Sequence, residues 1–261
     1  MTRTDVRLDT SKRFGTKAAT LFGTACLLVL AGCSGEESGT ASSGVVTSAT
    51  AQETPAPSAA PATTAPAPAA AAVEAPAAQG TVDVAELMKP GALPDVVMGD
   101  PNAPVTIVEY ASMTCGHCAT FHIQTLPTIK ANYIDTGKAK LIMREFPFDP
   151  RALAAFMLAR CAPEDKRTAM VDVLFRQQDQ WARAQNASEA LFNISKLAGF
   201  TQESFAACLN DKDLQTKIVE TQERGEKEFG VAATPTLFVN GNRYSGAMGA
   251  PELSAVIESM L

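Results

Sequence analysis

Val105-Thr106-Ile107-Val108-Glu109-Tyr110-Ala111-Ser112-Met113-Thr114-Cys115-Gly116-His117-Cys118 is the stretch that decides the fold of this chain. Its first half is an apolar run typical of a buried strand, and its end places two thiols one helical turn apart. The first turn of a helix has unpaired backbone N–H groups and the positive end of the helix dipole, so the pKa of a thiol there falls. We therefore expect Cys115 to be the reactive thiol and Cys118 to close a disulfide with it.

The two residues between the cysteines, Gly116 and His117, are predicted to tune this redox pair. The His117 imidazole can donate to the neighbouring thiolate and, when protonated, adds positive charge beside it. Both effects stabilise the reduced form, which makes the disulfide a stronger oxidant. The alternative for an isolated C-x-x-C is a metal site or two unrelated buried thiols.

Length and charge exclude some classes of function. The chain has 261 residues, enough for one or two domains, and a formal net charge of −6. Charged residues make up 19% of the sequence and form no basic run, so we expect no nucleic-acid partner.

The first residues are predicted to form a lipoprotein signal peptide, residues 1–32. An apolar segment, Ala18–Ala31, follows several basic residues and is too short to span a bilayer permanently. It ends in Leu30-Ala31-Gly32-Cys33, which resembles a bacterial lipobox, so Cys33 is predicted to carry the lipid. The alternative is an ordinary secretory signal whose cysteine is incidental. Loss of Cys26 with the signal peptide and lipidation of Cys33 leave four of the six cysteines as thiols in an oxidising compartment.

Residues 33–81 are predicted to form a disordered tether. The segment is rich in Ala, Pro, Ser and Thr and almost lacks large apolar side chains, so it cannot form a core. As a flexible coil it would reach on the order of 40 Å. The folded domain is expected at residues 82–261, and a passive spacer is the simplest role for the tether.

The domain is predicted to alternate strands and helices around a helical insertion at about residues 149–229. The helix that carries the cysteines should run to about Gly137 and bend at Pro127, which lacks a backbone donor. A second strand is expected at Lys138–Phe146. After the insertion, two strands joined by an Asn240-Gly241 turn precede a last helix. The order is βαβ, helices, ββα, which indicates an α/β fold.

Within the insertion, one helix is predicted at Glu164–Arg183. Apolar and polar residues recur there at helical spacing and form a stripe that should face the core, namely Met170, Leu174, Gln178 and Trp181, widened by Val171 and Phe175.

Two further side chains near the cysteines are candidates for chemistry. Glu109 lies in a strand of mostly apolar residues, so a carboxylate beneath the disulfide could accept or relay the proton that Cys118 loses. A solvent-facing glutamate is the alternative. His122 falls on the same helical face as both cysteines, which is a conceivable metal triad, but a fourth ligand is missing. We therefore expect a packed or rim histidine and no metal site.

Cys161 and Cys208 fall near the ends of two predicted helices in the insertion. An oxidising compartment favours their pairing in a structural disulfide, and free buried thiols are the alternative. Closing a loop of this length would stabilise the domain by about 4 kcal/mol on the chain-entropy model.

Residues 82–261 resemble the DsbA-like family of bacterial envelope thiol oxidoreductases, particularly its alphaproteobacterial members. The resemblance rests on the string from Val108 to Cys118 and on Arg144-Glu145-Phe146-Pro147. It implies a thioredoxin fold with an inserted helical domain. It also implies that Cys115 and Cys118 are the catalytic pair.

The same resemblance implies that the Thr234–Pro235 peptide is cis and lies across from the cysteines, where the backbone can pair with an extended substrate strand. It assigns Glu109 as the acid beneath the site. The chain departs from the best-known oxidases at Gly116, where they have a proline, and at Thr234, where they have an aliphatic residue. Both residues also occur in relatives that isomerise or reduce disulfides, so the redox role stays open.

Together these features predict a protein disulfide oxidoreductase without a cofactor that oxidises dithiols in newly exported proteins. The resemblance implies a quinone-linked membrane partner that reoxidises it. We expect a monomer in the bacterial envelope, facing the periplasm and anchored at Cys33. The alternatives are a disulfide isomerase or reductase of the same fold and, from a different class, a lipid-anchored metal-binding module that uses the cysteines and His122.

Overall fold

The computed structural model describes residues 73–261. The predicted signal peptide 1–32, Cys33 and the tether up to residue 72 lie outside the described residues. Within residues 73–261, no helix combines the length and the apolar character needed to cross a membrane.

A five-stranded sheet forms the centre of the domain, in the order β1-β3-β2-β4-β5. Its strands are β1 (Val97–Met98), β2 (Val105–Ala111), β3 (Ala139–Glu145), β4 (Thr236–Val239) and β5 (Asn242–Ser245). β2 and β3 are parallel, as a helical crossover between them requires, and the other neighbours are antiparallel. The predicted hairpin turn is present, with φ values of 44° at Asn240 and 85° at Gly241.

The helix that carries the cysteines contains two wider turns. It consists of α2 (Gly116–Thr120), the π-helical η1 (Phe121–Thr125), α3 (Leu126–Ile129) and the π-helical η2 (Lys130–Ile134). Pro127 has no N–H to donate and its ring crowds the preceding turn, so the π-turn at η1 accommodates it. The expected irregularity at Pro127 therefore takes the form of a π-turn, and the helix ends at Ile134 rather than at Gly137.

The helical insertion begins at Pro150 and ends at Phe229. It consists of α4 (Pro150–Cys161), η3 (Glu164–Lys166), α5 (Arg167–Arg176), α6 (Gln178–Ala182), α7 (Ala187–Ser195), η4 (Lys196–Ala198), α8 (Gln202–Leu209) and α9 (Lys212–Phe229). The single helix predicted at Glu164–Arg183 is wrong, because Gln177 leaves helical geometry and separates α5 from α6. The Trp181 indole N–H donates to the Leu174 carbonyl across this break, at 2.8 Å.

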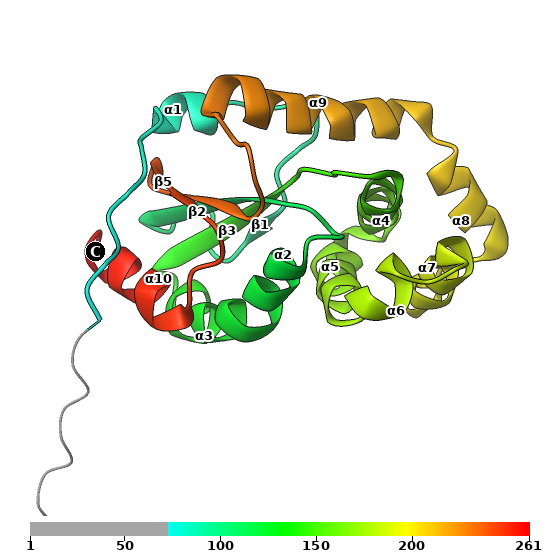
Figure 1. The fold of residues 1–261 in the computed structure, drawn as a ribbon, viewed down its shortest axis with the longest axis horizontal. Helices are drawn as coiled ribbons and strands as arrows, with labels where there is room; N and C mark the ends of the chain where they lie inside the picture. The colour runs from blue at the N-terminus through cyan, green and yellow to red at the C-terminus, as the bar shows by residue number, and fades with distance from the viewer. Residues whose placement is uncertain (1–72) are drawn as a thin grey trace, which may run out of the picture. The chain divides into compact units, whose positions relative to one another are not determined.

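Helices cover both faces of the sheet (Figure 1). The remaining helices are α1 (Val84–Leu87) and α10 (Ala250–Glu258). α1 and α9 lie over one face, and α3 and α10 lie over the other. Gly225 lets α9 approach the sheet closely, since a Cβ there would lie 2.5 Å from the Tyr110 ring. Ile107 packs on the side of α3 and α10. Because strand residues alternate, Glu109 points to that same side. It lies beneath the helix that carries the cysteines, residues 116–134, which we call the redox helix.

The largest buried cluster joins the insertion to the redox helix. Phe156, Leu174 and Trp181 belong to it, and so do Met113 and Cys118. Trp181 is fully buried, which agrees with its predicted place on a core-facing stripe. The insertion therefore packs directly against the second cysteine and shields it from water.

Both edges of the sheet carry features that differ from the sequence expectation. β1 has only two residues, too few for an alternating pattern to reveal it. Residues 79–81, which the sequence composition places in the tether, pair with β5. The Gln79 N–H donates to the Arg243 carbonyl, and the Arg243 N–H donates to the Gly80 carbonyl, each at 2.8 Å. An edge strand has unpaired backbone groups that recruit such a segment, so the folded domain begins before residue 82.

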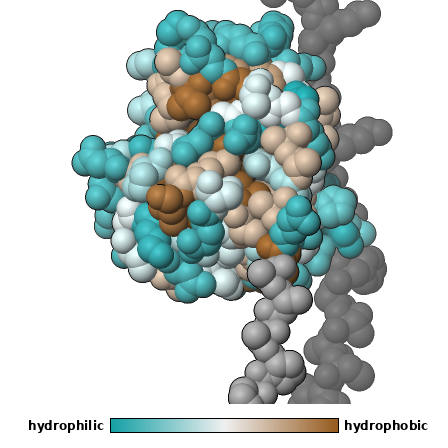
Figure 2. Space-filling model, turned by 90° about the vertical axis from the view of Figure 1, so that its left-hand side faces the viewer, coloured by the Kyte–Doolittle hydropathy of each residue, from teal (hydrophilic) through white to brown (hydrophobic). Residues whose placement is uncertain are grey.

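The face that carries α1, β5 and α10 has a mixed surface (Figure 2). Small apolar patches lie between hydrophilic side chains there. Val84, in α1, is one of the exposed apolar residues. Scattered apolar side chains of this kind are ordinary on a protein surface.

Candidate active site

Cys115 occupies the N-cap position of α2, at the end of the loop that follows β2. The loop is held by Thr114, whose hydroxyl donates to one oxygen of Asp149 at 2.5 Å. The other oxygen of Asp149 caps α4, accepting the N–H groups of Arg151 and Ala152 at 2.8 and 3.0 Å. A single carboxylate therefore links the insertion to the loop between β2 and α2, residues 112–115, which we call the redox loop.

The thiolate of Cys115 is strongly favoured. Hydrogen bonding from the Cys118 thiol is the largest cause, and the pKa of Cys115 falls to about 5 although partial burial opposes this. The Thr234 hydroxyl and the backbone N–H groups of Cys118 and His117 lower the pKa further. At neutral pH Cys115 is therefore mainly thiolate, which is the form that attacks a disulfide. Because its pKa is low, Cys115 also leaves faster than an ordinary thiol when a disulfide that contains it is cleaved.

Cys118 has the opposite character. It is completely buried, and this burial is the main reason that its pKa is raised. The hydrogen bond to Cys115 and the negative charge of Glu109 raise the pKa further. Cys118 therefore keeps its proton until it attacks, and its reaction needs a proton acceptor.

We expect alkylation of the reduced protein by iodoacetamide to titrate with a midpoint near pH 5, because only the Cys115 thiolate reacts. The lowered pKa also stabilises the folded, reduced form. This contribution is complete above the ordinary thiol pKa and is lost as the pH falls through about 5.

Urea unfolding of the reduced protein should therefore show a higher midpoint at pH 7 than at pH 4. The difference between the two pH values should be smaller in Cys115→Ser, which controls for the titration of carboxylates. An alkylation midpoint near that of a free thiol would contradict this expectation.

Glu109 and His122 form a buried pair beneath the redox helix. His122 Nε2 lies 2.8 Å from Glu109 Oε2, and the side chains are 4% and 0% exposed. The imidazole also stacks on Phe175, with ring centroids 4.1 Å apart. Glu109 is thus buried, as its proposed role requires. His122 is packed, as expected, but no sequence pattern indicates its contact with Glu109.

His122 contacts Glu109 and does not form a metal triad with Cys115 and Cys118. Within residues 73–261, no group of three or more His, Cys, Asp or Glu side chains is arranged to hold a metal ion. The cysteines of the redox motif are free thiols in the structure.

The Thr234–Pro235 peptide is cis and faces Cys115. The Cys115 thiol donates to the Thr234 carbonyl oxygen at 3.3 Å. The buried Thr234 hydroxyl has no partner among the described residues, so it can donate to the sulfur once the thiol proton has left. The Pro235 carbonyl accepts the Gly246 N–H at 2.8 Å, which anchors the loop.

Gln178 is a site residue that the sequence revealed only as a member of an apolar stripe. Its side-chain amide donates to the carbonyls of Met113 and Cys115, at 2.8 and 2.9 Å. Through it, α6 holds the backbone of the redox loop. A polar residue on a core-facing stripe was the available signal, but no pattern showed which carbonyls it would meet.

Gly116 and His117 are exposed at the mouth of the site. A Cβ on Gly116 would meet nothing within 4 Å. The backbone N–H of His117 acts on Cys115, whereas no hydrogen bond joins its imidazole to another residue of the described region. Redox tuning by the His117 side chain therefore stays a prediction.

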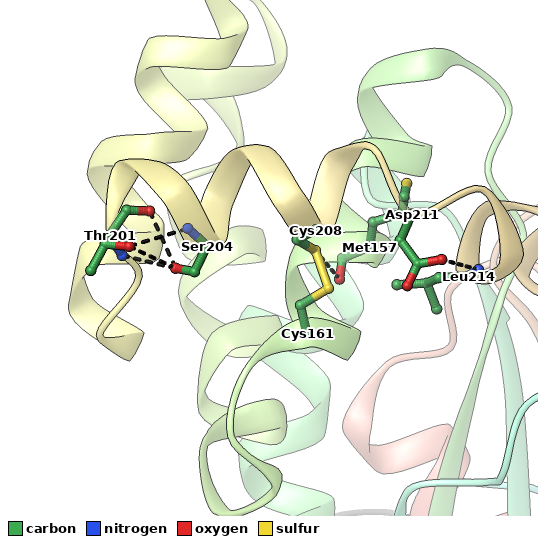
Figure 3. The surroundings of a disulfide bond; sticks show 7 residues. All are labelled: Met157, Cys161, Thr201, Ser204, Cys208, Asp211 and Leu214. Carbon is green, nitrogen blue, oxygen red and sulfur yellow. Dashed lines mark hydrogen bonds between the residues drawn. A yellow bond between two sulfur atoms is a disulfide. The ribbon is translucent and has the colours of Figure 1, made fainter.

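Cys161 and Cys208 form a disulfide that joins the end of α4 to the last turn of α8 (Figure 3). The two residues are 47 positions apart in the chain, and their Cα atoms lie 6.1 Å apart. Thr201 and Ser204 cap the start of α8 with reciprocal hydrogen bonds, so the bond connects two well-formed helices.

The site combines a stabilised Cys115 thiolate, a buried Cys118 thiol and the cis Thr234–Pro235 loop beside Cys115. This arrangement supports exchange between a dithiol and a disulfide. The site therefore defines the class of the thiol–disulfide oxidoreductases.

Comparison with known proteins gives the same class. Residues 92–259 match the family described as Thioredoxin. The crystal structure of alpha-DsbA1 from Wolbachia pipientis is similar, with 34% identity, a TM-score of 0.62, and 67% of this chain and 94% of that chain covered. The chain belongs to the thioredoxin family, in its DsbA-like branch, as the sequence resemblance implied.

Curated relatives carry related names. A Rickettsia bellii protein, "Putative protein-disulfide oxidoreductase", is 34% identical over 56% of this chain and 57% of its own length. A Bacillus anthracis protein, "Probable disulfide bond formation protein D", is 30% identical over 56% of this chain and 69% of its own length. The chain thus spans little more than half the length of the Rickettsia relative. The predicted thioredoxin fold with a helical insertion is confirmed.

Proposed function

We propose that this protein oxidises pairs of thiols in newly exported proteins and so introduces disulfide bonds into them. The observation that supports this most is the Cys115 thiolate, with its pKa of about 5. A thiolate of this stability favours the reduced enzyme over its disulfide, and that makes the disulfide a strong oxidant. The names of the relatives support the same chemistry.

In the proposed reaction a substrate thiolate attacks Cys115 Sγ of the Cys115–Cys118 disulfide. A mixed disulfide forms through Cys115, and Cys118 leaves with the electron pair and takes up a proton that Glu109 supplies. A second substrate thiolate then attacks the substrate sulfur, and Cys115 leaves as its stabilised thiolate. The Thr234 backbone before Pro235 would position the substrate strand during both steps.

A disulfide isomerase or reductase of the same fold is the second candidate, and Gly116 and Thr234 favour it by resemblance. The two functions separate in a paired assay with ribonuclease. We expect the oxidised protein to form disulfides in reduced, unfolded ribonuclease and to reactivate scrambled ribonuclease poorly. Efficient reactivation of the scrambled substrate, with slow oxidation of the reduced one, would favour the isomerase.

The proposed oxidase must be reoxidised after each turnover. By family resemblance we assign this step to a quinone-linked membrane protein. We further propose that the protein acts as a monomer at the periplasmic side of the bacterial envelope and that a lipid on Cys33 anchors it there.

Cys33→Ala is expected to release the protein from membranes or to block removal of the signal peptide, because the lipid would have no attachment site. Fractionation of cells labelled with a radioactive fatty acid measures both effects. Cys26→Ala is the matched control and should behave as wild type, since Cys26 would leave with the signal peptide. A Cys33→Ala protein that is processed normally and stays membrane-bound would count against the anchor.

A further inference from the structure

Glu109 has one carboxylate oxygen that the contact with His122 does not use. Oε2 lies 2.8 Å from His122 Nε2, whereas Oε1 is buried and has no hydrogen-bond partner among the described residues. Leaving a buried acceptor unpaired costs free energy, so its retention points to a use in part of the reaction cycle. The charge of Glu109 acts on the Cys118 thiol, which places the two groups within electrostatic reach.

His122 faces a second compartment of the molecule. It lines a cavity of about 520 Å³ between the redox helix, β3 and the α4 and α5 helices of the insertion. Leu126, Phe156 and Val171 form part of its wall, and neither redox cysteine lines it. A cavity of this size has room for water.

The imidazole therefore bridges two environments. Its Nε2 contacts the buried carboxylate, and its Nδ1 makes no hydrogen bond within residues 73–261. Stacking on Phe175 holds the ring in this orientation. Histidine can bind a proton at one nitrogen and release another from the second, which an amide cannot do.

We infer that Glu109 and His122 form a proton relay that carries the proton of Cys118 to the cavity lined by His122, away from the side where substrates meet Cys115. This inference rests on the proposed dithiol–disulfide exchange and adds the route of its proton. Glu109 accepts the proton, and His122 is the residue that exchanges it with water.

The relay acts when Cys118 resolves a mixed disulfide on Cys115. The imidazole starts protonated at both nitrogens, with Nε2–H donating to Glu109 Oε2. Cys118 gives its proton to Glu109 Oε1, and its sulfur forms a bond to Cys115 Sγ. The bond between Cys115 and the bound thiol breaks, and that thiol leaves as a thiolate with the electron pair. His122 Nδ1 then gives a proton to water in the cavity, and reduction of the disulfide reverses each step.

The test follows the reaction of the reduced protein with oxidised glutathione by rapid-mixing kinetics. The first phase is attack by Cys115 and depends on glutathione concentration. The second is displacement of glutathione by Cys118 and does not. His122→Gln keeps a donor toward Glu109 but cannot pass a proton. We expect it to slow the second phase by about tenfold or more and to leave the first phase near that of wild type.

Two further variants separate a relay from a packing role. Ile123→Gln places the same side chain one residue along, at a position that is 38% exposed, and should match wild type in both phases. His122→Ala leaves space beside the cavity, so added imidazole should restore its second phase and should do so with a solvent isotope effect.

An unchanged second phase in His122→Gln would overturn the relay. A slow phase in both His122 variants that imidazole does not restore would also overturn it, because this pattern indicates packing alone. A wild-type protein that does not react with oxidised glutathione would instead refute the proposed function.

Discussion

Cys115→Ser is expected to reduce dithiol oxidation to background, whereas Cys118→Ser is expected to trap substrates as stable mixed disulfides. Cys115 is partly exposed at the start of α2 and has a pKa of about 5, so it alone is placed to react. Cys118 is completely buried and is needed only to resolve the intermediate. Non-reducing gels of each variant, incubated with a protein that contains disulfides, measure the trapped species.

Serine is nearly isosteric with cysteine, so both variants should retain the fold, and the Cys161–Cys208 disulfide is present in each as an internal control. Trapped complexes should disappear when dithiothreitol is added. Equal trapping by the two variants would refute the assigned roles, since it would mean that the buried thiol reaches substrates as easily as the exposed one.

Removal of the disulfide in the insertion should lower the free energy of unfolding by about 2 to 4 kcal/mol. The bond closes a loop between residues 47 positions apart, and the chain-entropy model gives about 4 kcal/mol for such a loop. The lower end of the range applies if the unfolded chain retains structure, which reduces the entropy that the bond removes. Urea unfolding of Cys161→Ala/Cys208→Ala against wild type, with the redox pair reduced in both, measures the difference.

The double variant should keep the iodoacetamide titration of Cys115. The hydrogen bonds that hold the redox loop come from Asp149 and Gln178, and neither Cys161 nor Cys208 takes part in them. That result would separate a stabilising role from a catalytic one. An unfolding midpoint equal to that of wild type would show that the bond contributes nothing measurable to stability.

Much of the fold could be predicted because it depends on local patterns. The apolar run of β2, the turn at Asn240 and Gly241, and the helical spacing of Trp181 each reflect a short-range physical rule, and each is present in the structure. The two-residue β1 and the break at Gln177 could not be predicted, because they depend on the partner strand and on packing around Trp181.

The site shows the same division. The two cysteines and the Thr234–Pro235 loop stand out as motifs. The contacts that support them do not stand out in the sequence. Gln178 and Asp149 lie far along the chain from the redox loop that they contact. His122 lies in the redox helix, whereas its partner Glu109 lies in β2. Only the folded chain brings these side chains to the redox loop and to Glu109.

The reduction potential of the Cys115–Cys118 pair tests the proposed oxidase most directly. It is measured by equilibrating the purified mature protein with glutathione buffers and counting free thiols. A stabilised Cys115 thiolate predicts a potential well above the value of about −270 mV for thioredoxin, toward the value of about −120 mV for DsbA. A potential near that of thioredoxin would contradict the oxidase and would favour a reductase.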